Sequence, residues 1–108
     1  MITIDAVCRL VGNLEVVELE RWISEEWVLP GREGGVYVFH DIDVARVRLI
    51  VEMKRDLAIE ESAMPVVLHL LDQLYATRRR LKALTSALDE LPPEVRAAVT
   101  ARLQGEGE

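Results

Sequence analysis

The stretch GREGGVYVF, residues 31–39, decides the fold, because its composition departs from the helical patterns on either side. Gly31, Gly34 and Gly35 make its first half typical of a turn, and the Val-Tyr-Val-Phe half is β-branched and aromatic. We therefore expect a small β-hairpin here, the size of a wing between helices. The chain around it is predicted to be mainly α.

Two short helices are predicted before the hairpin, over residues 3–12 and 13–27. Thr3 can cap the first helix and Gly12 can stop it, and Asn13 can cap the second. In the second helix, positions that recur every three or four residues predict a buried face of Val16, Leu19, Ile23 and Trp27.

A third helix is expected after the hairpin, capped by Asp41. Its core-facing positions are predicted to be Ile42, Ala45, Leu49, Met53 and Leu57, with a second apolar strip of Val44, Val47 and Val51. Helix, turn, helix, wing and helix together predict a winged helix-turn-helix domain over residues 1–58.

A long helix is predicted next, beginning between Glu60 and Pro65 and broken after Leu91 by two prolines. Alternating spacings of three and four are typical of a coiled-coil seam, which cannot be buried by a single helix. Residues 59–91 are thus expected to form a homodimer, and residues 92–108 a short amphipathic helix with a flexible tail. The predicted dimerisation residues are Val67, Leu70, Leu74, Thr77, Leu81, Leu84 and Leu88.

The composition excludes several classes of function. The chain has 108 residues, is 50% hydrophobic and carries a net charge of −6, so it lacks the basic character typical of nucleic-acid or anionic-membrane binders. Nothing resembles a signal peptide or a membrane span, and we expect a cytoplasmic location. Cys8 is the single cysteine, and His40 with Asp41 and Asp43 fits a strand end and helix cap better than a metal site. We expect no enzyme activity, metal or cofactor.

The second predicted helix is strongly acidic: residues 13–27 hold five glutamates and one cation, Arg21. A DNA-reading helix needs Arg, Lys, Asn or Gln in the major groove, and these carboxylates would repel phosphates. A solvated helix face explains the glutamates about as well as a binding surface does. Trp22 favours binding, because Trp beside charge is common at interfaces. The predicted docking residues are Glu15, Glu18, Trp22, Glu25 and Glu26.

The only basic run is Arg78-Arg79-Arg80 with Lys82. It could contact nucleic acid. A role on the outer face of the coiled coil fits better, with Arg78 and Lys82 spaced to pair with acids of the partner chain.

With these segments in view, the chain resembles the CbpM family of chaperone modulators, which are similar to MerR-type regulators. The resemblance lies in WISEEWVLP (residues 22–30), YVFHDIDVARVRLI (37–50), DLAIEE (56–61) and MPVVLHLLDQL (64–74). It implies a DnaJ-type co-chaperone (CbpA-like) as partner, bound through its J-domain so that it no longer stimulates a DnaK-type ATPase. The main alternative is a MerR-like transcription regulator that places Arg32, Arg46 and Arg48 on phosphates. A coiled-coil scaffold without a dedicated partner is a third interpretation.

Overall fold

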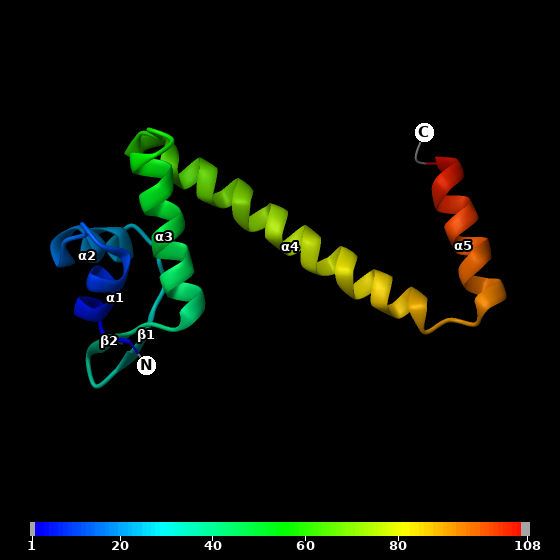
Figure 1. The fold of residues 1–108 in the computed structure, drawn as a ribbon, viewed down its shortest axis with the longest axis horizontal. Helices are drawn as coiled ribbons and strands as arrows, with labels where there is room; N and C mark the ends of the chain where they lie inside the picture. The colour runs from blue at the N-terminus through cyan, green and yellow to red at the C-terminus, as the bar shows by residue number, and fades with distance from the viewer. Residues whose placement is uncertain (1, 107–108) are drawn as a thin grey trace. The chain divides into compact units, whose positions relative to one another are not determined.

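The computed structural model describes residues 2–106, and the chain divides into two compact units, Met1–Leu68 and His69–Glu108. The first unit begins with two short helices, α1 (Ile4–Val11) and α2 (Val16–Ser24), followed by the strands β1 (Gly31–Glu33) and β2 (Val36–Val38) (Figure 1). It continues through α3 (Asp41–Arg55) and the short 3-10 helix η1 (Glu61–Ala63). This order confirms the predicted winged helix-turn-helix fold.

Local signals set the ends of α1 as predicted. The Thr3 hydroxyl accepts a hydrogen bond from the Ala6 backbone N–H at 3.2 Å. Gly12 ends the helix with φ +81°, a backbone conformation that glycine adopts without steric cost. The ends of α1 therefore follow from the nearby sequence alone.

The wing is an antiparallel hairpin in which Glu33 pairs with Val36 across a two-residue turn. Both turn residues, Gly34 and Gly35, have positive φ, which the tight turns favoured by twisted hairpins require. An isolated bridge between Ile2 and Phe39 joins the start of the chain to the end of the wing through two backbone hydrogen bonds of 3.1 and 2.9 Å.

The ends of α2 and the start of α3 differ from the prediction. Asn13 has φ +51°, and Glu15 takes the N-cap position of α2. The helix ends at Ser24, three residues earlier than expected, because the chain reverses at Glu26 with φ +63°. At α3 the N-cap is His40, not Asp41, and the Asp43 carboxylate accepts the His40 backbone N–H at 2.9 Å.

The core of the first unit uses a different strip of α3 from the predicted one. The buried residues are Val44, Val47, Ile50 and Met53, whereas Ile42 is 78% exposed and Leu57 66% exposed. Ala45 is also exposed and Leu49 is half-buried, so of the predicted core strip only Met53 is fully buried. Both strips are apolar, so periodicity could not choose between them; packing against α1 does.

The long helix α4 (Met64–Asp89) begins within the predicted interval. Its first turns complete the core of the first unit, where Met64 and Leu68 are buried together with Leu19, Phe39 and Ile50. From His69 onward the chain forms the second unit, which also contains α5 (Pro93–Glu106). No residue between 69 and 105, the part of this unit whose burial is described, is buried.

Candidate interaction surface

The solvent-exposed face of helix α2 carries both apolar and polar side chains. Val17, Glu20 and Ser24 recur at intervals of three and four and are all exposed, with the Val17 side chain 75% exposed. Leu19 and Trp22 lie on the opposite face and are buried. The surface that would meet a partner is therefore centred on Val17 and Glu20.

The expectation that Trp22 lies on an exposed acidic stripe is wrong. Its side chain is 1% exposed, and its ring lies 6.3 Å from that of Trp27, which is buried as predicted. The Lys54 ammonium lies 5.6 Å from the centre of the Trp22 ring, within the range of a cation–π contact. Trp22 thus belongs to the core of the domain and is not available to anchor a partner.

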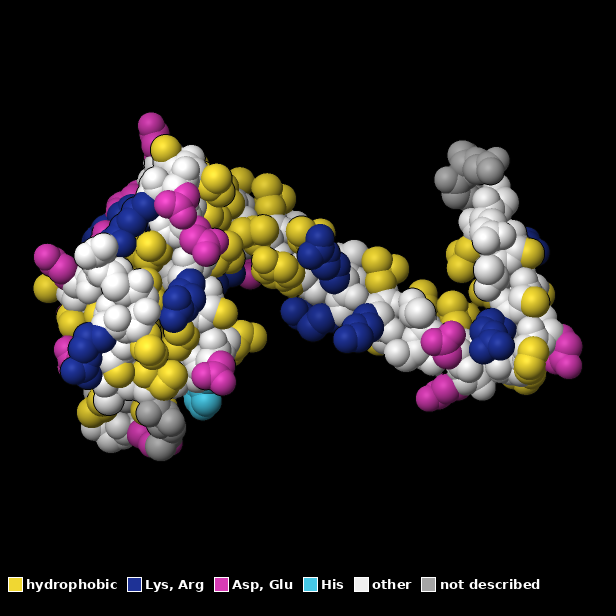
Figure 2. Space-filling model, viewed as in Figure 1, with side chains coloured by type: hydrophobic (Ala, Val, Ile, Leu, Met, Phe, Trp, Pro, Cys, Tyr) yellow, Lys and Arg dark blue, Asp and Glu magenta, His cyan; other side chains and the backbone are white. Residues whose placement is uncertain are grey.

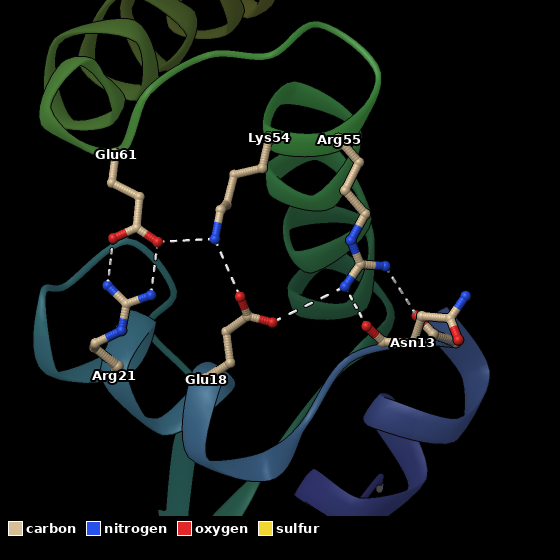
Figure 3. A network of polar contacts seen from close by, with 7 residues as sticks. Asn13, Glu18, Arg21, Lys54, Arg55 and Glu61 are labelled. Carbon is tan, nitrogen blue, oxygen red and sulfur yellow. Dashed lines mark hydrogen bonds and ion pairs between the residues drawn. The ribbon is translucent and has the colours of Figure 1, made fainter.

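Glu18 is also partly turned inward, as part of a network that joins three segments (Figure 3). The Lys54 ammonium donates to the Glu18 carboxylate at 3.0 Å and to the Glu61 carboxylate at 2.8 Å. Arg55 lies 3.9 Å from Glu18 and donates to the backbone carbonyl of Asn13. Glu18 therefore helps to hold α2 against α3, and little of its charge is left for a partner.

Glu61 is the second anchor of this network. Arg21 donates two hydrogen bonds to its two carboxylate oxygens, at 2.5 and 2.6 Å. These bonds, and then the one from Lys54, lower the pKa of Glu61 to about 2. The same contacts raise the pKa values of Arg21 and Lys54, chiefly through their hydrogen bonds to Glu61. The only cation of α2 is therefore neutralised within the domain.

Four other glutamates around α2 face solvent. Glu15 is at its N-cap, Glu20 on its outward face, and Glu25 and Glu26 follow its last residue. We call these four glutamates, together with the exposed Val17, the acidic surface of α2. Three of them, Glu15, Glu25 and Glu26, were predicted as docking residues; Glu20 and Val17 were not.

The arginines of the DNA-binding alternative are engaged within the domain. Arg32 lies over the Tyr37 ring at 4.6 Å and donates to the Tyr37 hydroxyl at 2.9 Å. Arg46 donates to the Trp27 carbonyl at 2.9 Å, and Arg48 lies 3.4 Å from the Leu10 carbonyl. Each of these guanidinium groups also has N–H donors beyond the contacts named here.

The predicted dimerisation residues lie along one side of α4. Leu70, Leu74, Leu81 and Leu84 are between 43% and 59% exposed, Thr77 is exposed, and Val67 and Leu88 are half-buried. Figure 2 shows apolar side chains along the first part of α4, followed by a group of Lys and Arg side chains. Within residues 2–106, none of these seven side chains is fully buried.

Groups that could support chemistry are sparse among residues 2–106. No three His, Cys, Asp or Glu side chains there lie close enough together to hold a metal ion. Cys8 is a buried free thiol whose pKa is raised, first by burial and then by Asp5 and Glu18, which lowers its reactivity.

Residues 2–86 match the family described as MerR HTH family regulatory protein, which spans the helix-turn-helix, the wing and most of α4. The chain belongs to the MerR family. No curated protein and no solved structure matches it. Within residues 2–106, no helix of this MerR-family chain has both the length and the apolar character needed to cross a membrane.

Sequence reasoning missed the outward face of α2 in this MerR-family domain. The pair Leu19 and Trp22 has the spacing of a buried strip, and placing both inward would have turned Val17 and Glu20 outward. The partners of Glu61 gave no such signal, because Arg21 is 40 residues away in the sequence. Only the folded chain brings them together.

Proposed function

We propose that this MerR-family protein is a modulator that binds the J-domain of a DnaJ-type (CbpA-like) co-chaperone and blocks its stimulation of a DnaK-type ATPase. The observation that carries the proposal is the charge of α2. Its exposed glutamates are Glu15, Glu20, Glu25 and Glu26, and its one arginine is bound to Glu61. A helix-turn-helix with this face suits a cationic protein surface and is repelled by DNA phosphates.

The acidic surface has the parts of a small protein-docking site. Val17 offers an exposed apolar side chain, and the carboxylates around it can steer a basic helix and fix its orientation. A J-domain presents such a basic helix to its ATPase, so a modulator bound there would compete directly. The network through Glu18, Lys54 and Glu61 supports this by holding α2 rigidly on α3.

The protein is proposed to act as a homodimer. The seam from Val67 to Leu88 would leave four leucines that are 43% to 59% exposed in water if α4 stayed single. Pairing with a second copy removes this apolar area from water and is favoured by the hydrophobic effect. One dimer would then offer two acidic surfaces to co-chaperones.

The test is a binding assay with an isolated J-domain, followed by an assay of ATPase stimulation. Reversing charge with Glu20→Lys and Glu25→Lys should weaken binding by about tenfold or more, and raising NaCl from about 50 to about 500 mM should weaken wild-type binding. The matched control is Glu33→Lys with Glu52→Lys, the same charge change at exposed positions of β1 and α3. Equal binding by the two double variants would remove α2 from the interface.

A further inference from the structure

The basic run on α4 has no acidic residue one helical turn away on its own helix. Arg78, Arg79, Arg80 and Lys82 are exposed and form no ion pair with any residue among 2–106, and residues 73–88 contain no Asp or Glu. If Val67 starts the first heptad, the positions flanking the seam over this region are Leu71, Gln73, Arg78, Arg80, Thr85 and Ala87. Pairing of two α4 seams therefore supplies no acid to these cations, so any acids of a partner chain that pair with them must lie outside the seam.

Three of these cations share one side of the helix. Arg78, Arg79 and Lys82 follow Tyr75 at the spacings that place side chains on a common face. The centre of this face, which we call the cationic stripe, lies roughly a third of a turn from the seam of Leu74, Thr77 and Leu81, with Arg78 at the edge that flanks the seam. Arg79 and Lys82 would stay accessible after α4 pairs with a second copy.

The opposite charge is present elsewhere in the chain. Residues 1–68 contain 13 Asp and Glu against 7 Lys and Arg, a net charge of −6, whereas residues 69–108 contain six of each and are neutral. The exposed part of this negative charge includes the acidic surface of α2, whose glutamates Glu15, Glu20, Glu25 and Glu26 form no ion pair with residues 2–106. A polyanion such as DNA would meet the net negative charge of the whole chain before it met the stripe.

We propose that the cationic stripe of one copy binds the acidic surface of α2 on a second copy, so that a basic partner must displace it. Exposed charge pairs are individually weak and are screened by salt, so this contact adds to the seam and does not replace it. The cationic stripe of one copy would then compete with the basic partner for the acidic surface of the other copy. This regulatory role rests on the proposed function, but the contact between copies does not.

Charge reversal on each side tests the contact with the full-length protein. The stripe variant is Arg79→Glu with Lys82→Glu, and the surface variant is Glu20→Lys with Glu25→Lys. The measurement is the self-association constant, from sedimentation equilibrium at about 50 and about 500 mM NaCl. We expect wild-type self-association to weaken by about threefold to tenfold at the higher salt, and each variant to show that loss already at low salt.

Mixing the two variants separates contact between copies from contact within one chain. In the mixture, the acidic surface of the stripe variant meets the intact stripe of the surface variant, and the two reversed faces also match. Mixed dimers should therefore form about threefold or more in excess of either variant alone at low salt. A contact within one chain would not be restored by mixing, and that result would overturn the proposal.

The control Arg96→Glu with Arg102→Glu makes the same charge change on α5 and should leave self-association unchanged. Helical circular dichroism and the fluorescence of Trp22 and Trp27 report whether each variant is folded. J-domain binding should persist or rise in the stripe variant and fall in the surface variant. Self-association that does not depend on salt, with intact J-domain binding, would refute the contact between copies but not the proposed function. Binding of duplex DNA that depends on the stripe, without salt-sensitive self-association, would also refute the contact.

Discussion

In residues 2–68, side chains such as Leu19, Phe39 and Ile50 form a closed core, whereas no residue in 69–105 is buried. The charges differ in the same way. Glu18, Arg21, Lys54 and Glu61 neutralise one another in the first unit, while the cations of the stripe in the second form no such pairs among the described residues. These four charges of the first unit are therefore paired within it, whereas the second unit leaves an apolar seam and several cations exposed.

The largest expected effect tests whether Trp22 belongs to the closed core. Trp22→Ala should lower the free energy of unfolding by about 3–5 kcal/mol, because it removes a large buried side chain and leaves a cavity. Tyr75→Ala on α4, an exposed aromatic, should change it by less than about 1 kcal/mol. Urea denaturation followed by circular dichroism measures both. A stable Trp22→Ala protein that fails only to bind its partner would return Trp22 to the docking surface.

The second prediction tests the apolar seam of α4 in the second unit. Leu81→Asp should raise the dimer dissociation constant by at least about tenfold, because a buried carboxylate in an apolar seam is costly. Ser86→Asp adds the same charge on the outer side of α4 and serves as the control. Sedimentation equilibrium distinguishes them, and an unchanged dimer in the Leu81 variant would move the interface away from the seam.

A smaller effect concerns the charge network that closes the first unit. Lys54→Met keeps the aliphatic stem but leaves Glu18 and Glu61 facing each other without their shared cation. The free energy of unfolding should fall by about 1–2 kcal/mol. Lys82→Met in the second unit should leave the free energy of unfolding almost unchanged. Equal stability of the two variants would mean that the network only orients α2.

The smallest expected effect is a loss of folding stability at low pH. The pKa of Glu61 is lowered to about 2 from the ordinary value of 4.5, so its ionised form is favoured in the folded protein. Its stabilising contribution is complete above about pH 4.5 and is lost as the pH falls toward 2. Glu61→Gln should show a shallower loss of stability over that range. Because the Glu61 side chain is partly exposed, solvent screening keeps the difference small.

The sequence alone determined the features that depend on neighbouring residues. Thr3 and Gly12 bound α1, Gly34 and Gly35 form the turn of the wing, and the prolines at 92 and 93 separate α4 from α5. Such signals act over a few residues through backbone conformation and hydrogen bonding, so they can be recognised in the sequence without knowledge of the tertiary structure.

Tertiary structure alone decided which of two apolar strips of α3 is buried, that Trp22 lies in the core, and that Glu18 pairs with Lys54. These outcomes depend on contacts between residues as many as 40 positions apart, as between Arg21 and Glu61. A helix can bury any face that is apolar enough, and the neighbour that packs against it makes the choice. For that reason the acidity of α2 and most of its outward glutamates could be predicted from the sequence, but the inward positions of Glu18 and Trp22 could not.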